Sequence, residues 1–589
     1  MSAKSIEQFF TGKSLVVPDY QRDYAWKEGN VDDLFDDVEE ALQAGGGHYL
    51  GTFILSQTKK ASSLLVVDGQ QRLTTLTMLL DALIDLVADT TIKQHYYNTF
   101  ISHPVTGAKF SVLGDNDTFF HELLAENNPE PESDGQYRLR AAYSRIRLRV
   151  HALVAQGGQD LIKQWLLCVS QMEVLEFIEP DEGKAIRMFQ SVNDRGVPLA
   201  KMDIVKSLLV YYSNRYLDGA MDNYISSKFG NAFKSFSKAK RLANEDGYKV
   251  RLVGRDSFRE DDVLRYHYFA FDASPFGVTA GADYTATAET VLAIFLKPAL
   301  QSLRNDRSRL QGFINAYVDD LVAFFSGLEA LLQSTRTDLS TYLLFVVQDL
   351  SAILYPLVIR LYLMGLLSRS GARSDSRCVQ DVIEAVDLRV FKLRGTNPQV
   401  DIYRITQQLP KLSIDDVVSQ LQQFCQKFMP DAMLSSRLVT EDVYRNLGLP
   451  RMLLAEEEEV RTTEKAPQLN IHQLPLLNRT GLTVEHIFPQ EPGFNVRAYG
   501  FKNITEYEQE NHRIGNLVLL EAPLNSRCNN RTVADKMSAP DLYLSSGLDA
   551  VKKLSADHAG SAQGFQKHDA DARSDLLAKL VVKRWPIVG

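Results

Sequence analysis

An apolar run, a glycine turn and a leucine-rich segment follow one another directly between residues 64 and 87. Residues 64–67 read Leu-Leu-Val-Val, Gly69 lies in the turn, and from Leu73 onward leucines recur at the spacing of one helix face. Apolar β-branched residues favour a strand, and a recurrence every three or four residues favours a helix. The sequence therefore predicts a strand, a tight turn and an amphipathic helix, which are elements of an α+β domain.

The turn of residues 68–72 can bind an anion. Free backbone N–H groups and the helix dipole gather at a helix N-terminus, and Arg72 adds a positively charged fork for phosphate. Asp68 can hold a cation or a ribose hydroxyl. A structural alternative stays open, in which Asp68 and Thr74 cap the helix and Arg72 pairs with a surface acid, because the longer phosphate-loop pattern is absent.

A second group of polar residues lies near the C-terminus. Glu485 and His486 stand side by side at the end of an apolar stretch that predicts a strand, and a second short apolar run follows Asn516. Asn525 comes next and can N-cap a helix that contains Val533. Strand, strand and helix around one cation is the plan of the ββα-metal nucleases. The alternative is chance, since one of 11 His can easily lie next to a Glu.

The residue types in this group suit phosphodiester hydrolysis. Water needs a base whose pKa is near neutrality, so we predict His486 as the catalytic base. A divalent cation, Mg²⁺ or Mn²⁺, can stabilise the departing oxygen, and the side-chain oxygens of Glu485 and Asn525 suit such an ion. Asn529 is a weaker metal candidate, because an Asn one turn into a helix often faces solvent. Asn516 can hold the second ring nitrogen of the base.

These C-terminal pieces resemble the HNH endonucleases. In that family an acid-His pair ends the first strand, an Asn follows on the second, and another Asn on the helix completes the metal site. The spacing from Asn516 to Asn525 is similar to that of the family, whereas Glu485 stands where the family often has Asp. The resemblance implies a C-terminal ββα-metal (HNH) nuclease domain and supports a catalytic role for Asn516.

The N-terminal part resembles the GmrSD-type restriction endonucleases, which are type IV, modification-dependent enzymes. The segments Pro18-Asp-Tyr-Gln-Arg22, Val67-Asp-Gly-Gln-Gln-Arg72 and Asn193-Asp-Arg-Gly-Val-Pro-Leu199 stand in that family's order. Together with the nuclease motif they are similar to its fused single-chain form, which includes the SspE and BrxU proteins. The resemblance implies a ParB/sulfiredoxin-like domain that binds and hydrolyses an NTP, either GTP or ATP. The implied nucleotide-binding residues are Gln21, Arg22, Asp68, Gly69, Gln70, Gln71, Arg72, Thr74, Asn193 and Arg195.

The length of 589 residues is too great for a single core. We expect a multidomain α+β protein with a ParB/sulfiredoxin-like domain over residues 1–217, a mostly helical middle over residues 218–430 and an HNH-type nuclease domain over residues 431–589. The acidic run of residues 456–459 is expected to be a solvated helix end, followed by a linker into the nuclease.

Composition and charge limit the compartment and the mode of DNA binding. The four Cys form no CxxC pair and the N-terminus lacks the apolar core of a signal peptide, which suits a reducing cytoplasm. Charges and a proline interrupt the longest apolar stretch, residues 341–367, so no membrane span is expected.

The formal net charge is -9, but from residue 471 onward 14 Lys and Arg face 13 Asp and Glu. DNA contact should therefore be a local patch. Its candidates are Arg513, Arg527, Arg531 and Lys536, with scattered solvated charges as the alternative. His472 and His512 could also approach the nuclease site, but an exposed or structural role is favoured for both.

The sequence as a whole predicts a nucleotide-regulated, modification-dependent DNA endonuclease of antiphage restriction that nicks or cleaves. Its expected partners are double-stranded DNA, in the form of modified phage or host DNA, and a nucleotide, and a homodimer stays open. One alternative is a nucleotide-dependent DNA-binding sensor or clamp without cleavage activity. The other is a nuclease whose N-terminal domain binds DNA and no nucleotide.

Overall fold

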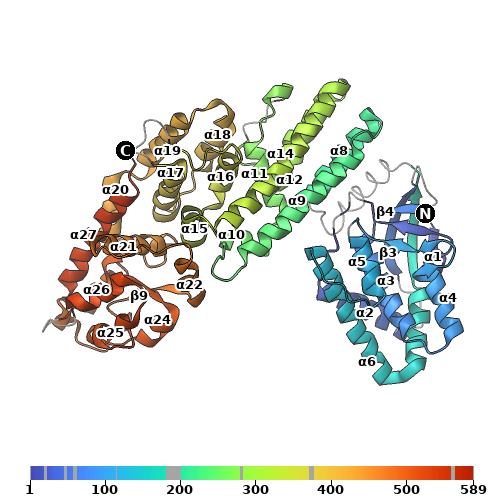
Figure 1. Cartoon of the computed structure of the whole chain (residues 1–589), viewed down its shortest axis with the longest axis horizontal. Coiled ribbons are helices and arrows are strands. Elements are labelled where there is room, and N and C mark those ends of the chain that lie inside the picture. The colour runs from blue at the N-terminus through green and yellow to red at the C-terminus, as the bar shows by residue number, and fades with distance from the viewer. Residues whose placement is uncertain are drawn as a thin grey trace. The chain divides into compact units, whose positions relative to one another are not determined.

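The computed structural model describes residues 2–18, 21, 23–44, 49–57, 63–114, 116–180, 201–278, 283–370, 377–558 and 564–587 (Figure 1). Contacts divide the chain into two compact units, one of Met1–Ser237 with Leu292–Val322 and one of Lys238–Val291 with Ala323–Gly589. The borders expected after residues 217 and 430 both fall inside a unit. In the described part of the chain, no helix combines the length and the apolar character needed to cross a membrane.

A six-stranded mixed sheet forms the centre of the first unit. Its strands lie in the order β1 (Ser2–Ser5), β8 (Glu173–Glu179), β3 (Tyr49–Gln57), β4 (Ser63–Asp68), β2 (Ser14–Val16) and β7 (Phe110–Ser111). β3 pairs parallel with β8 and antiparallel with β4. Phe53, Ile54 and Leu55 of β3 are all fully buried. Because successive side chains of a strand point to opposite faces, the middle of this sheet is covered on both sides.

Helices pack around this sheet and share one hydrophobic core with it. The helix predicted from Leu73 onward is confirmed as α3, which buries its leucines and packs against α6. The helices of this part of the chain are α1 (Ile6–Phe10), α2 (Glu28–Ala44), α3 (Gln70–Asp85), α4 (Thr90–Phe100), α5 (Asn116–Leu124) and α6 (Asp134–Gln171), followed after β8 by α8 (Lys201–Leu217). The predicted strand, turn and helix are therefore β4, Gly69 and α3.

A buried carboxyl group joins α3 to α6. Oδ2 of Asp81 accepts a hydrogen bond of 2.6 Å from the Tyr143 hydroxyl, and Asp81 is 8% exposed. Burial raises the pKa of Asp81 to about 6, although the bond from Tyr143 acts in the opposite direction. The folded chain therefore keeps this carboxyl protonated over a pH range in which an unfolded chain ionises it.

The described part of the second unit is helical around one two-stranded sheet, formed by β9 (Leu482–His486) and β10 (Leu517–Glu521). The helices used below are α17 (Val379–Val386), the π-helix η5 (Asp387–Leu393), α20 (Asp431–Thr440), α21 (Leu449–Thr463), α24 (Ala522–Cys528), α25 (Val533–Ser538), α26 (Asp549–His558) and α27 (Lys567–Arg584).

The fully buried Arg389 of η5 ties the helical middle to the C-terminal part. It donates 2.7 Å hydrogen bonds to the Trp585 carbonyl and to Asp431, and one of 3.1 Å to the Met429 carbonyl. The contacts of Arg389 thus lie on both sides of the border expected at residue 430.

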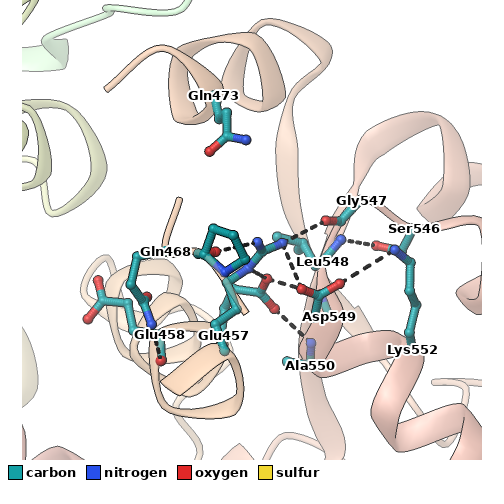
Figure 2. Close-up of polar contacts among 12 residues, drawn as sticks. Glu457, Glu458, Gln468, Gln473, Ser546, Gly547, Leu548, Asp549, Ala550 and Lys552 are labelled. Carbon is teal, nitrogen blue, oxygen red and sulfur yellow. Dashed lines mark hydrogen bonds and ion pairs between the residues drawn. The ribbon is translucent and has the colours of Figure 1, made fainter. Parts of the chain in front are cut away.

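The acidic run of residues 456–459 is not the solvated helix end that the sequence predicted. Glu457 is 1% exposed and accepts hydrogen bonds from the N–H groups of Asp549 and Ala550, at 3.0 and 2.7 Å (Figure 2). Arg461 donates to Glu457 at 2.5 Å and pairs with Asp549 at 3.0 Å. A carboxylate at a helix N-terminus satisfies free N–H groups. Glu457 of α21 thus caps α26, which corrects the expected solvated position to a buried contact.

We predict that Asp81→Asn stabilises the full-length protein more at pH 7.5 than at pH 4.5. Because the folded pKa of Asp81 lies above the unfolded value, the wild type loses stability as pH rises from about 4 to about 6, and Asn removes that loss. The advantage of the variant should grow by roughly 1–2 kcal/mol between the two pH values. Calorimetric unfolding at both pH values measures it.

The matched control for this experiment is Tyr143→Phe. It removes the donor that favours the ionised form of Asp81, so the stability of this variant should fall more steeply with pH than that of the wild type. An Asp81→Asn advantage of equal size at both pH values would show that the carboxyl is not protonated in the folded state.

Candidate active site

Strands β9 and β10 and helix α24 position the predicted nuclease residues. The antiparallel ladder places His486 opposite Leu517 and Glu485 opposite Val518. α24 begins directly after β10 and packs against both strands. The predicted order of strand, strand and helix is confirmed.

His486 ends β9, and its imidazole is enclosed. The residue is 4% exposed, its Nε2 lies 2.9 Å from Nδ1 of His512, and its Nδ1 lies 3.3 Å from Nε2 of Gln490. The ring centroid of Tyr444 lies 4.3 Å away. Burial, together with the charges of His512 and Lys536, lowers the pKa of His486 to about 3. The imidazole is therefore neutral near pH 7, but in this buried setting its pKa lies below the near-neutral value expected of a base.

The carboxylate of Glu485 faces a buried lysine. Oε1 of Glu485 lies 2.7 Å from Nζ of Lys536, which also donates a 2.7 Å hydrogen bond to the carbonyl of His486. Burial raises the pKa of Glu485, although the ammonium acts in the opposite direction. Lys536 is 0% exposed, so in the described structure its charge faces the chain's own acid and carbonyl and is not presented to DNA.

Asn516 fixes the backbone that follows β9. Its Oδ1 accepts from the N–H of Phe488 at 2.7 Å, and its Nδ2 donates to the carbonyl of Asn511 at 2.7 Å. Its own carbonyl accepts from the N–H of Ile487 at 2.8 Å. The ring nitrogens of His486 have other partners. Asn516 therefore supports the backbone next to His486 and does not make the direct contact with its ring that the sequence led us to expect.

The two asparagines predicted as metal ligands have different surroundings. Nδ2 of Asn525 donates to Oγ1 of Thr483 at 2.8 Å and to the carbonyl of Val484 at 3.2 Å, so this side chain lies against β9. Asn529 is exposed and follows the end of α24 with φ of 40°. Asn525 lies inside α24, and Thr532 caps α25, so the predicted N-cap role of Asn525 is wrong.

Glu485 and Asn525 offer the kinds of oxygen that a hard cation takes. Oε1 of Glu485 makes no directed hydrogen bond to the described residues, and the Asn525 amide lies against the same strand. The donors therefore fit Mg²⁺ or Mn²⁺ in kind. A cation would have to share or displace the Lys536 ammonium. The described residues contain no group of three or more His, Cys, Asp or Glu arranged for a metal, so water would have to complete the shell.

The remaining predicted DNA contacts differ in exposure. Arg527 and Arg531 are exposed, one near the end of α24 and one just beyond it. Arg513 is half-buried and pairs with Glu510 at 3.4 Å. Arg527 and Arg531 are thus the two predicted cations that a phosphate backbone can meet without a change in the described structure.

The predicted anion-binding turn lies at the end of β4. Gly69 has φ of 94°, and a Cβ there would lie 2.4 Å from a ring carbon of Phe53, so the position requires glycine. Asp68 accepts a 2.8 Å hydrogen bond from the N–H of Gly69, and burial raises its pKa even though Arg72 lies nearby. Thr74 donates to the carbonyl of Gln70 at 2.8 Å, within α3.

Arg72 lies across β3. Its guanidinium donates to the carbonyls of Leu50 and Thr52, at 2.9 and 3.2 Å, and stands over the ring of Phe53. A Cβ at Gly51 would lie 1.5 Å from its Nη1, so this glycine gives the guanidinium its space. Among the described residues, Arg72 does not form the ion pair with a surface acid that the structural alternative predicted. A guanidinium has five N–H donors, so phosphate binding stays a prediction.

Two further motif residues hold the main chain near this turn. Gln21 donates to the carbonyl of Val67 at 2.7 Å, and Gln71 accepts from the N–H of Ala25 at 2.7 Å. These bonds join the segment before α2 to the β4–α3 turn. Gln70 is buried at the first position of α3. The predicted nucleotide-binding residues Arg22, Asn193 and Arg195 lie outside the described residues.

Two residues around His486, Tyr444 and Gln490, were not predicted as site residues, and a third, His512, was given a less specific role. Tyr444 lies between α20 and α21 and carries no local signal. Gln490 follows His486 by four positions, and His512 precedes Asn516 by four, so both lie close in the chain to a predicted residue. The contact of His512 with Nε2 of His486 bears out the alternative that this histidine approaches the site.

Two family models match this chain. The GmrSD restriction endonuclease N-terminal domain matches residues 6–210, and the GmrSD restriction endonucleases C-terminal domain matches residues 429–580. The first match contains the β4–α3 turn, and the second contains the whole site around His486. A search of curated proteins finds no match. Since the two matches cover both ends and more than half of its 589 residues, the chain belongs to the GmrSD restriction endonuclease family.

Proposed function

We propose that this restriction endonuclease hydrolyses DNA phosphodiester bonds with His486 as the general base. One observation carries this assignment. The imidazole of His486 ends β9 with one ring nitrogen beside the half-buried His512 and the other beside the exposed Gln490. A base needs a fixed ring and a lone pair on the side from which water comes.

In the proposed reaction, Nδ1 of His486 accepts a proton from water while the water oxygen attacks phosphorus. A new P–O bond forms, and the bond to the leaving sugar oxygen breaks with its electron pair on that oxygen. The imidazolium keeps its Nε2 proton toward His512 and later returns the extra proton to solvent. Arg527 and Arg531 are placed to contact the phosphate backbone.

We propose that Glu485 and Asn525 hold the divalent cation, Mg²⁺ or Mn²⁺, with Asn529 as a weaker candidate. When bound, the cation would stabilise the negative charge that develops on the phosphate and on the leaving oxygen. The side chains of Glu485 and His486 leave β9 toward different partners, Lys536 and His512. The chain's own ammonium balances the carboxylate until a cation shares it or displaces it.

We also propose that cutting depends on a change of state, in response to a nucleotide at the β4–α3 turn and to modified DNA. Glu485 and His486 are 5% and 4% exposed, so a phosphodiester reaches them only after neighbouring side chains move. A family member that restricts modified DNA needs its nuclease closed toward other DNA. NTP hydrolysis at the turn would then be coupled to opening.

We predict that His486→Ala lowers the cleavage rate by about 10²- to 10⁴-fold, the usual effect of losing a general base. Plasmid nicking and linearisation with Mg²⁺ or Mn²⁺, with and without NTP, on modified and unmodified DNA side by side, measure the effect. His472→Ala is the control, because His472 is exposed and lies at the start of α22 (Gln473–Thr480). Undiminished cleavage by the His486 variant would refute this role.

For the metal site we predict that the double variant Glu485→Gln/Lys536→Met binds Mn²⁺ at least about tenfold more weakly than the wild type. The double change is needed because removing one partner would leave a buried charge, at a cost of about 3–5 kcal/mol. Titration calorimetry measures the affinity, and chelation should abolish cleavage by the wild type. An unchanged Mn²⁺ affinity would remove Glu485 from the ligand set.

For the nucleotide site we predict that Arg72→Ala weakens GTP or ATP binding by about tenfold or more, which corresponds to roughly 1.4 kcal/mol or more. Equilibrium binding and NTP hydrolysis are measured together with the unfolding temperature, because Arg72 also holds the carbonyls of β3. Arg140→Ala, at a surface position that pairs with Glu130, is the control. Nucleotide binding that survives in the Arg72 variant would exclude a phosphate role.

A further inference from the structure

The two ring nitrogens of His486 are coupled through their partners. Nε2 lies 2.9 Å from Nδ1 of His512, and Nδ1 lies 3.3 Å from the amide of Gln490. A contact between two imidazole nitrogens needs one proton and one lone pair. Whether Nε2 of a neutral His486 donates or accepts in this contact therefore decides whether Nδ1 has a lone pair or a proton.

Two proton arrangements satisfy the contact between His486 and His512. In the first, Nε2 of His486 carries the proton and donates it to Nδ1 of His512, which leaves a lone pair on Nδ1 of His486. In the second, His512 donates, and Nδ1 of His486 carries the proton. Only the first arrangement leaves a ring nitrogen that can accept a proton from water.

The surroundings of the two nitrogens agree with the first arrangement. Gln490 is exposed, so Nδ1 of His486 is the nitrogen that water reaches when one surface side chain moves. His512 is half-buried, and its carbonyl accepts a 3.1 Å hydrogen bond from the N–H of Val443. Nε2 thus points toward an anchored residue and Nδ1 toward the surface.

Tyr444 contacts both imidazoles, stacked on His512 and tilted by 55° against His486. Its ring is stacked on His512 at 5.1 Å with an angle of 10° between the planes, and its centroid lies 4.3 Å from that of His486. Asn446, two residues on, donates to the carbonyl of Lys392 at 2.9 Å. The segment that carries Tyr444 is thus bound at Val443 and at Asn446, on either side of the ring.

We propose that His512 is a positioning residue for DNA hydrolysis, which accepts the Nε2–H of His486 at its own Nδ1 and so keeps the Nδ1 lone pair of His486 ready for the proton of the attacking water. Tyr444 packs against both rings and limits their rotation. This proposal rests on the proposed role of His486 as the base. His512 itself touches neither the water nor the phosphate in this scheme.

Two substitutions of similar polarity separate this role from simple packing. The amide oxygen of Asn can stand where Nδ1 of His stands, whereas the amide of Gln reaches the position of Nε2. We expect His512→Asn to keep kcat within about threefold and His512→Gln to lower it by about 10- to 100-fold, with KM for DNA unchanged in both. Nicking kinetics on plasmid DNA and the unfolding temperature of each full-length variant are measured.

A readout independent of activity is the tautomer of His486. In protein labelled with ¹⁵N at histidine, and with the signals assigned through His486→Gln, the wild type and His512→Asn should show a protonated Nε2 and an unprotonated Nδ1. His512→Gln should lose this preference. Tyr444→Phe, which keeps the stacked ring, should behave as the wild type, and Tyr444→Leu should behave as His512→Gln.

The outcomes distinguish this proposal from the proposed function. If His486→Ala still cleaves, the base assignment fails and this proposal fails with it. If His486→Ala is inactive while both His512 variants cleave at the wild-type rate, only the positioning role is overturned. Equal losses of kcat in His512→Asn and His512→Gln with an unchanged tautomer would also overturn it, because packing alone would then explain the loss.

Discussion

The buried ammonium of Lys536 is the interaction on which the nuclease site depends. It joins α25 to the end of β9 by an ion pair with Glu485 and a hydrogen bond to the carbonyl of His486. Taking either charge away would leave the other uncompensated in a dry environment, at a cost of about 3–5 kcal/mol. The same contact fixes the backbone that carries the His486 imidazole. One cation, the Lys536 ammonium, therefore both balances the charge of Glu485 and helps to orient the proposed base.

The sequence predicted the elements of the site better than its contacts. Apolar runs and spacing were enough to place β9, β10 and a helix after them, since these signals are local. The partner of Lys536 is not local, because a strand 50 residues earlier supplies it. A lysine is usually solvated, and only the fold reveals the exception. The same reasoning failed for Glu457, which caps α26 from inside an acidic run.

The motif near the N-terminus shows a different limit of prediction from sequence. The turn, the glycine and the helix stand where the pattern placed them, because backbone conformation and periodicity follow from residue type. The side chains of Gln21, Gln71 and Arg72 hold neighbouring main chain, through partners on other segments that no spacing rule names. One residue can both support the fold and bind a ligand, and a sequence motif alone does not distinguish these two roles.

The segment between α20 and α21 has a practical consequence for anyone who dissects this enzyme. Tyr444 lies outside the strand, strand and helix that carry the other site residues, and it is held in place from both sides, through Val443 to His512 and through Asn446 to η5. A fragment trimmed to β9, β10, α24 and α25 would contain every residue that the nuclease motif names. It would still lack Tyr444, which packs against His486, the proposed base, so its kinetics would describe a different site from that of the whole chain.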